Sequence, residues 1–334
     1  MGELTQSLPK PTESVVITVR ETPVVILGYN RAGKVERLIE RLAEIKPRNV
    51  IFSVDGPKPH IAGDAEKVDA VRALVERITW TPHVETRFRE VNAGLQIAVT
   101  DAVTHAVNTF GQVVVLEEDT LPGHDWLPYA NEMLERYRDE ERIAHISGYN
   151  VVPPTHLTQG ARGSRLSRYP ESIAWATWDR AWAQYDPTLE WARNVSVSDL
   201  ARITGSRMGA LRWKQNFADA AAGRISTWAY RWIASMWAHD RFVLSPNANL
   251  VTYAGYDEGT HTVMKAPWDE LPLFDGARDE LTSGEPQFDE RCDAWLAKTV
   301  FAESAYGVAR GVAITAVLEA RKRQRARKQA LAAR

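Results

Sequence analysis

The stretch VVVLEEDTLP, Val113–Pro122, decides which fold this sequence predicts. Four apolar residues run directly into three acids, Glu117, Glu118 and Asp119. A short apolar run of this kind is typical of a strand that is buried on both faces of a sheet. Three neighbouring carboxylates repel one another, so their position at a strand end costs free energy unless a cation relieves the repulsion.

The residues before this stretch alternate between apolar runs and helical patterns. Strands are predicted at Val24–Leu27, at Val50–Val54 and in the alternating segment His83–Arg89. Helices are predicted between them: one that follows Arg31 and stops before Pro47, one with Asp64 as its N-cap, and one after Gly94. This alternation predicts an α/β fold, with a mostly parallel twisted sheet flanked by helices.

Polar residues follow several of these strands, at what should be one edge of the sheet. Asn30 and Arg31 follow the first strand, and Asp55 ends the second. Ligands of open α/β sheets bind at the carboxyl ends of the strands. Carboxylates there suit Mg²⁺ or Mn²⁺, which usually sit between a protein carboxylate and substrate phosphates. The acidic stretch therefore favours a diphosphate ligand such as a nucleotide sugar, although a solvated acid cluster is an alternative.

The composition limits partners and location. The 334 residues include 41 basic and 43 acidic ones, a net charge of -2, which gives no reason to expect a nucleic acid as partner. The single Cys292 excludes an internal disulfide. There is no signal-peptide pattern and no apolar run of about 18 residues, so we expect a cytoplasmic protein.

Tryptophan is concentrated in two segments after about residue 150. One segment holds Trp175, Trp178 and Trp182, and the other holds Trp228 and Trp232. Spacings of three and four place side chains on one face of a helix. These indoles can form a core, or they can offer a platform on which the apolar face of a sugar stacks.

The C-terminal segment carries the strongest local charge. From Arg321 on there are seven basic residues and no acid, and the preceding GVAITAVLEA predicts a helix with a basic end. A solvated helix terminus whose cations complement the helix dipole is one interpretation. The other is peripheral docking on anionic lipid at the inner face of a membrane.

The order of several motifs resembles the GT-A glycosyltransferases. The motifs are PVVILGYNRAGKVERLIERL, VIFSVDG, NAGLQIAVTDAV, VVVLEEDTLPGHDWLPYANEMLERY, IAHISGYN, RYPESIAWATWDRAW, STWAYRW and NLVTYAGYDEGTHT. They cover about residues 22–265, and the resemblance is closest to the branch of N-acetylglucosaminyltransferase I and bacterial nucleotide-diphospho-sugar transferases.

This resemblance implies a function. It implies a metal-dependent, inverting transfer of a hexosyl or N-acetylhexosaminyl group from a nucleotide-diphosphate sugar to a hydroxyl of a glycan or glycolipid, in surface polysaccharide or other glycan synthesis. It also implies a nucleotide-sugar half (22–150) and a Trp-rich acceptor half (151–265). The polar, proline-containing residues 1–21 predict a flexible lead-in, and residues 266–334 are expected to form a C-terminal extension with the basic helix.

The resemblance also implies roles for individual residues. Glu117, Glu118 and Asp119 match the acidic DXD motif, in which Asp119 would bind Mn²⁺ or Mg²⁺ and Glu118 would contact the sugar or ribose. Glu in place of Asp at 118 departs from the pattern. His261 would lie near the diphosphate or ligate the metal. The other substrate-binding candidates are Arg31 and Asp55 for the nucleotide, and Asn92, Glu171, Trp175 and Trp228.

The proton acceptor is missing from its expected place. An attacking hydroxyl needs a carboxylate to take its proton, and the family places an aspartate where STWAYRW has Ala229. Asp257 and Glu258 are the substitute candidates, and a catalytically silent sugar-nucleotide or glycan-binding module is the alternative. A sugar nucleotidyltransferase is less favoured because GYNRAGK is poor in glycine, and a dehydrogenase because no G-x-G-x-x-G follows the first strand.

Overall fold

The structure is a computed structural model of the chain, and it describes residues 22–255 and 271–332. Two compact units make up the chain. The first runs to Gln184 and resumes at Arg241–Cys292, and the second comprises Tyr185–Asp240 and the residues from Asp293 on. The boundaries predicted at residues 150 and 265 separate a nucleotide-sugar half, an acceptor half and a C-terminal extension. Because they are defined by function, the two packing units do not test them and they stay predictions. The predicted lead-in, residues 1–21, lies outside the described residues.

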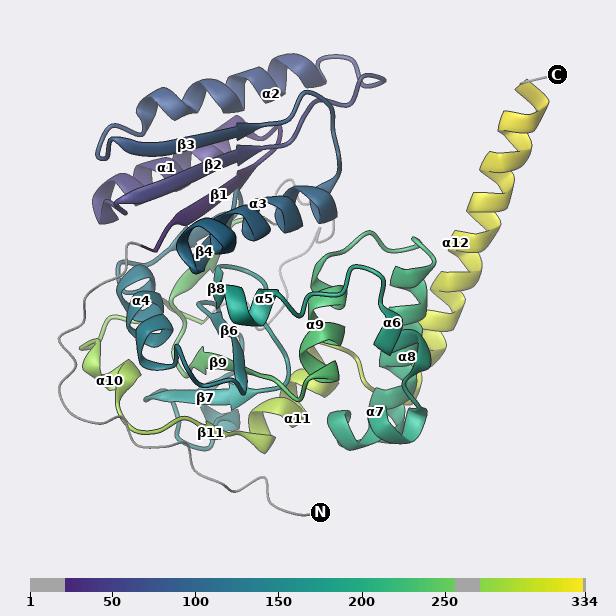
Figure 1. Cartoon of the computed structure of the whole chain (residues 1–334). Coiled ribbons are helices and arrows are strands. Elements are labelled where there is room, and N and C mark those ends of the chain that lie inside the picture. The colour runs from purple at the N-terminus through teal and green to yellow at the C-terminus, as the bar shows by residue number, and fades with distance from the viewer. Residues whose placement is uncertain (1–21, 256–270, 333–334) are drawn as a thin grey trace. The chain divides into compact units, whose positions relative to one another are not determined.

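Apolar runs form the first three strands, β1 (Val24–Gly28), β2 (Asn49–Val54) and β3 (His83–Phe88), which pair in parallel. Figure 1 shows them side by side. β1 and β2 are buried almost throughout, as expected for strands that are covered on both faces. The helices are α1 (Ala32–Ile45), α2 (Asp64–Ala73) and α3 (Leu95–Phe110). The predicted alternation of strands and helices is confirmed here.

Helix α1 forms because its apolar residues share one face. Val35, Leu38, Ile39 and Leu42 are all buried. Full burial of an aliphatic side chain contributes about 1.5–3 kcal/mol. The helix ends at Ile45 and is capped by Lys46, whose backbone is left-handed (φ 57°) and whose N–H donates to Leu42 O.

Asp64 does not cap helix α2, so that prediction is wrong. It is the first helical residue, and Gly63 stands at the cap position without a side-chain cap. The Asp64 carboxylate instead accepts hydrogen bonds from Tyr29 O–H (2.5 Å), Asn30 Nδ2 (2.7 Å) and Lys58 N–H (2.7 Å). These donors come from the loops after β1 and β2, so Asp64 ties both loops to α2.

Within the described residues the main sheet has nine strands, in the order β11-β7-β9-β6-β8-β4-β1-β2-β3. The further strands are β4 (Gln112–Glu117), β6 (Ile143–Ser147), β7 (Ser164–Ser167), β8 (Trp175–Trp178), β9 (Phe242–Pro246) and β11 (Gln287–Phe288). β8 is antiparallel to β4 and β6, and β7 is antiparallel to β9; the other five pairings are parallel. The predicted mostly parallel sheet is confirmed. A second sheet pairs β5 (Thr120–Pro122) with β10 (Val251–Tyr253).

The order of strands creates a binding edge. β1 lies between β2 and β4, so successive strands are added on opposite sides of β1. Loops that leave the carboxyl ends of such neighbours diverge and leave a crevice between them. The chain passes from β4 through Glu118 and Asp119 into β5 at this edge, which is where the sequence predicts the acids.

The first tryptophan segment is partly a strand. Trp175 and Trp178 lie in β8, so the helical-face interpretation is wrong for them, and Trp182 ends the short helix α5 (Asp179–Trp182). Trp175 stacks on His145, with ring centroids 5.2 Å apart and 6° between the planes. Burial lowers the pKa of His145 to about 3, so its ring is neutral at pH 7. These residues are buried and form core, which is the simpler of the two interpretations.

The second unit is helical. Its elements are α6 (Glu190–Asn194), α7 (Val197–Thr204), α8 (Arg207–Ala221), α9 (Ala229–Ala238), most of α11 (Glu290–Thr299) and α12 (Ala305–Ala332). Trp213 packs edge-on against Trp237, with centroids 4.8 Å apart. Thr315 of α12 donates a hydrogen bond to Asp219 of α8 at 2.9 Å. Helix α12 confirms the predicted C-terminal helix.

The remaining elements of the first unit are short helices around the sheet: η1 (Leu74–Arg77), α4 (Trp126–Arg136), η2 (Pro154–His156) and α10 (Asp279–Thr282). Among all the described helices, none combines the length and the apolar character that a membrane span needs.

Candidate functional site

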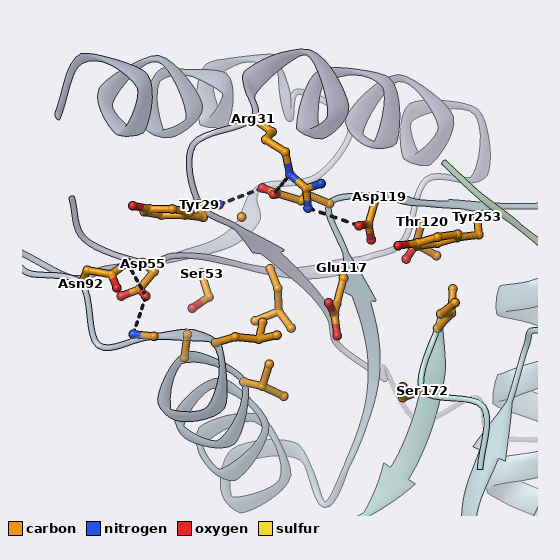
Figure 2. Close-up of a pocket in the computed structure, with 18 of the residues that line it drawn as sticks. Tyr29, Arg31, Ser53, Asp55, Asn92, Glu117, Asp119, Thr120, Ser172 and Tyr253 are labelled. Carbon is orange, nitrogen blue, oxygen red and sulfur yellow. Dashed lines mark hydrogen bonds and ion pairs between the residues drawn. The ribbon is translucent and has the colours of Figure 1, made fainter. Parts of the chain in front are cut away.

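A cavity of about 310 Å³ lies in the first unit at the carboxyl edge of β1, β2 and β4 (Figure 2). Six of the residues that the sequence singles out line it together: Arg31, Asp55, Asn92, Glu117, Glu118 and Asp119. They come from loops that are up to 88 positions apart in the chain, and the strand order brings them to one place. The lining residues that the sequence did not single out include Tyr29, Ser53, Lys58, Thr120, Ser172 and Tyr253.

Asp55 organises one end of this cavity. One carboxylate oxygen accepts hydrogen bonds from the N–H groups of Gly56 (2.8 Å) and Ala93 (2.9 Å). The other accepts from Asn92 Nδ2 and from Gly94 N–H, both at 2.9 Å. A carboxylate has about four acceptor sites, so these four donors fill them. Asp55 therefore fixes the loop before α3, which carries Asn92 into the cavity.

Asn92 offers one unused acceptor to the cavity. Its Nδ2 group donates to Asp55 and also to Gly56 O at 3.0 Å. None of the described residues donates to Asn92 Oδ1. The side chain is thus held by its amino group while its carbonyl oxygen is free for the N–H of a ligand.

Tyr29 is a lining residue that sequence reasoning missed. Its hydroxyl donates to Asp64, and Lys58 Nζ lies 4.9 Å from the centre of its ring. Burial and the Asp64 carboxylate raise the pKa of Tyr29, so the phenol keeps its proton. Figure 2 shows the ring lying over the end of the cavity that holds Asp55 and Asn92. The available signal was the aromatic residue directly after β1 in the motif GYN.

The acidic turn is compensated by Arg31. Glu118 accepts hydrogen bonds from Arg31 Nε and, at 2.9 Å, from Tyr29 N–H, and Asp119 Oδ2 lies 3.2 Å from Arg31 Nη2. Burial raises the pKa of Glu118 even though Arg31 pulls it down. The sequence predicts a cation for these carboxylates, and within the chain Arg31 supplies it. In Figure 2 the Glu117 side chain points away from Arg31.

The acids could hold only part of a metal coordination sphere. No group of three His, Cys, Asp or Glu side chains that could enclose a metal ion occurs among the described residues. Both Glu118 oxygens and one Asp119 oxygen already meet donors of the chain. The donor set therefore fits a hard divalent cation that takes one or two carboxylate ligands from the protein and the others from a diphosphate and water.

Thr120, which follows the acidic turn, carries an unsatisfied hydroxyl. The residue is fully buried and lines the cavity. Its Oγ1 atom makes no hydrogen bond with any described residue. A buried hydroxyl without a partner costs free energy, so this group suits a polar atom of a ligand.

The other predicted residues lie apart from these. Glu171 directly precedes the lining residues Ser172 and Ile173, and its carbonyl oxygen accepts hydrogen bonds from His145 and Ser147, both at 3.2 Å. Trp175 is fully buried in β8. Trp228 and Ala229 belong to the second unit, where Trp228 is buried and Ala229 begins α9. Asp257, Glu258 and His261 lie outside the described residues.

No family model matches the chain, and neither does any curated protein. Solved structures that are similar to part of it include a mannosyltransferase from Pyrobaculum calidifontis in complex with GDP-Man and Mn²⁺ (13% identity, 69% of this chain and 73% of that one, TM-score 0.34). Another is the apo structure of the bifunctional glycosyltransferase WbbM, with 13% identity over 77% of this chain and 52% of that one and a TM-score of 0.31. A third is a UDP-glucose pyrophosphorylase in complex with UDP-glucose, with 10% identity over 44% of this chain and 62% of that one and a TM-score of 0.25. All three TM-scores are below 0.5, so these similarities carry no argument about what this chain binds.

Proposed function

We propose that the cavity binds a nucleotide-diphosphate sugar and that the chain transfers the sugar to a hydroxyl of a glycan or glycolipid acceptor. One observation carries this proposal. A single cavity has the Tyr29 ring and the free amide oxygen of Asn92 at one end, and the acidic turn Glu117–Asp119 with its ion-paired Arg31 at the other. A flat heterocycle, a diphosphate and a hydroxyl-rich group need these three kinds of partner. The resemblance of the sequence motifs to GT-A enzymes points the same way.

The nucleobase and ribose would occupy the end near Tyr29 and Asn92. The Tyr29 ring is locked by its bond to Asp64, so it is a rigid surface for stacking. Asn92 Oδ1 would accept from an N–H of the base. Asp55 acts on the base through Asn92 in this proposal, because its own oxygens are filled by the chain.

The diphosphate would lie at the acidic turn. Arg31 can donate to phosphate oxygens, and Asp119 would bind Mn²⁺ or Mg²⁺, with His261 as a further candidate ligand. The metal, when bound, offsets the negative charge that develops on the leaving diphosphate. Glu117, Thr120 and Ser172 are left to orient the sugar hydroxyls, and Glu171 adjoins this end of the cavity.

Binding measurements test this proposal directly. Titrate the protein calorimetrically with UDP- and GDP-sugars, with and without Mn²⁺. Mn²⁺ should tighten binding at least tenfold in the wild type but not in Asp119→Asn, because one charge-assisted contact is worth about 1.5–3 kcal/mol. Asn92→Ala should weaken binding with or without the metal. If neither donor binds, or Asp119→Asn keeps the full metal effect, the proposed site is wrong.

A silent binding module is the second candidate, and Ala229 favours it. Alanine cannot accept a proton, so turnover needs another base, for which Asp257 and Glu258 remain proposals. The release of nucleoside diphosphate in the presence of an acceptor separates the two candidates. If the base belongs at position 229, Ala229→Asp raises the rate by tenfold or more without changing the affinity for the donor. Binding without turnover in both proteins would favour the module.

Peripheral contact with anionic lipid is the proposed role of α12. The seven basic residues from Arg321 on lie in or beyond its last turns. Earlier in the helix, Tyr306, Val312, Ile314 and Val317 are exposed. Exposed apolar side chains next to a basic run suit a lipid surface, where the apolar groups insert while the cations meet the headgroups.

A further inference from the structure

A second hollow, of about 860 Å³, opens at the amino end of α1. Five basic residues line it: Arg31, Lys34, Arg37, Lys58 and Lys67. The other lining residues are Tyr29, Asn30, Ala32, Gly33, Ala70 and Glu118. We call this hollow the basic groove. It shares Tyr29, Arg31, Lys58 and Glu118 with the first cavity, whereas Asn30, Arg37 and Lys67 line only the groove.

Part of the positive charge of the basic groove is not paired with an acid within the described part of the chain. Among the residues that the structure describes, Glu118 is the one acid that lines it, and Glu118 is engaged by Arg31 and by Tyr29 N–H. Asp64 lies close by, but its carboxylate already accepts from Tyr29, Asn30 and Lys58 N–H. Arg37 and Lys67 are exposed, and neither has an ion pair with any described residue. An anion that enters the groove would therefore compensate the charges of Arg37 and Lys67.

The amino end of α1 adds to the positive electrostatic potential of the basic groove. The first turn contains no acid, and no side chain caps the helix. Ala32 and Gly33, whose N–H groups belong to that turn, line the groove. The partial positive charge of a helix N-terminus and the side-chain cations therefore act on the same space.

We propose that the basic groove binds a phosphate or another oxyanion carried by a molecule other than the nucleotide donor. Arg37 and Lys67 would be its anchors, with Lys58 and the amino end of α1 contributing. This inference does not require sugar transfer. If the proposed function holds, the groove places a phosphate-bearing acceptor beside the donor, because the two hollows share Arg31 and Lys58.

Inorganic pyrophosphate is a suitable probe. Titrate it calorimetrically into the full chain in EDTA at low salt, comparing the wild type with Arg37→Gln/Lys67→Gln. Two charge-assisted contacts are lost, so the affinity should fall at least tenfold. As a matched control, Arg193→Gln/Arg207→Gln removes two exposed cations of the second unit and should stay within twofold of the wild type.

Competition separates the two sources of phosphate. Repeat the titration with saturating UDP or GDP; pyrophosphate should still bind, with an affinity within about threefold. Displacement of pyrophosphate by the nucleotide would assign the groove to the donor and overturn the proposal. A wild type that does not bind pyrophosphate, or a double variant that binds it equally well, would overturn it too. Donor binding can succeed or fail independently of these results.

Discussion

Asp55 shows at the scale of one residue how a charged group can organise the lining of a cavity through hydrogen bonds to the chain itself. Its two oxygens accept four hydrogen bonds from the chain, three of them from Asn92, Ala93 and Gly94. Asp55→Asn exchanges one acceptor oxygen for an amino group, which leaves up to two N–H donors without a partner. At about 1–3 kcal/mol for each unsatisfied donor, we expect a loss of about 2–4 kcal/mol in the free energy of unfolding, measured in urea.

The matched control for this variant is Asp69→Asn. Asp69 is an exposed aspartate that forms an ion pair with Arg72 three residues later on α2. Exposed pairs of this kind contribute well under about 1 kcal/mol, so this variant should unfold almost as the wild type does. Equal effects of Asp55→Asn and Asp69→Asn would contradict the structural role of Asp55.

The sequence pointed to some of the residues that line the candidate cavity and missed others. Arg31 and the acids were predictable because each follows an apolar strand, and strand ends mark the edge of a sheet. Their ion pairs were not predictable, because Arg31 and Glu118 are 87 residues apart and meet only when β1 pairs with β4. Tyr29 and Thr120 were missed because nothing in the sequence tells that one ring is locked or that one hydroxyl is buried.

At the scale of secondary-structure elements, the loop after β2 and the loop after β3 meet at Gly56. A Cβ atom added there would lie 2.3–2.6 Å from backbone atoms of Val91, so the loop after β2 and the loop after β3 can touch only through a glycine. Gly56→Ala should therefore destabilise the protein by about 1–3 kcal/mol or more in urea unfolding, and should weaken ligand binding in the first cavity.

A second glycine gives the opposite expectation. Gly33 lies in the first turn of α1, and a Cβ added there meets nothing within 4 Å. Gly33→Ala should leave the protein unchanged or stabilise it by up to about 1 kcal/mol, because alanine favours a helix and restricts the unfolded chain. Loss of stability in both variants would show that close approach is not what distinguishes Gly56.

The contact of α2 with the β1–α1 loop should depend on pH through Asp64. Burial opposes ionisation, but the hydrogen bonds from Lys58 N–H, Tyr29 and Asn30 hold the pKa of Asp64 below its ordinary value of 3.8. A lowered pKa in the folded state contributes stability that is present above 3.8 and is lost as the pH falls through the folded value. The stability deficit of Asp64→Asn should therefore be largest near neutral pH and should shrink below pH 3.8.

Urea unfolding at several pH values measures this deficit, and Glu66→Gln is the control. Glu66 is an exposed acid in the same first turn of α2. It makes none of the hydrogen bonds of Asp64, so its deficit should be small and nearly constant. A deficit of Asp64→Asn that grows toward acid would have the wrong sign and would contradict the assigned cause.

Periodicity predicted the elements before residue 120 and the C-terminal helix, but it failed at the first tryptophan segment. Runs such as Val24–Leu27 contain only apolar residues, so their burial on both faces was visible in the sequence. β8 was hidden because Trp175 and Trp178 are three positions apart, which is also helical spacing. β8 pairs with both β4 and β6, and these tertiary contacts override the local helical pattern of the tryptophans.

For the whole molecule, the distribution of charge is as informative as the fold. The chain has a net charge of -2, although seven cations and no acid follow Arg321, so the rest of the chain is acidic overall. That acidity disfavours nucleic acid as a partner everywhere except at the tail. The same helix also exposes apolar side chains, namely Tyr306, Val312, Ile314 and Val317. A lipid surface would use such apolar side chains, whereas a nucleic acid would not require them.

Vesicle binding tests this distribution of charge. Co-sediment the full chain with phosphatidylcholine vesicles that contain or lack about one third phosphatidylglycerol. Each cation near an anionic surface contributes about 1 kcal/mol, so Arg321→Gln/Lys322→Gln/Arg323→Gln/Arg325→Gln should lower partitioning by on the order of a hundredfold or more. Binding of the wild type should weaken as salt rises, because the attraction is screened.

Two further variants separate lipid docking from simple attraction between charges. Ile314→Ser/Val317→Ser should weaken binding to anionic vesicles without changing the charge of the helix, since both side chains are exposed in the free protein. Arg193→Gln/Arg207→Gln removes two exposed cations elsewhere and should bind vesicles as the wild type does. Equal binding to neutral and anionic vesicles, or tighter binding of the tail to a single-stranded oligonucleotide than to lipid, would contradict docking on an anionic membrane.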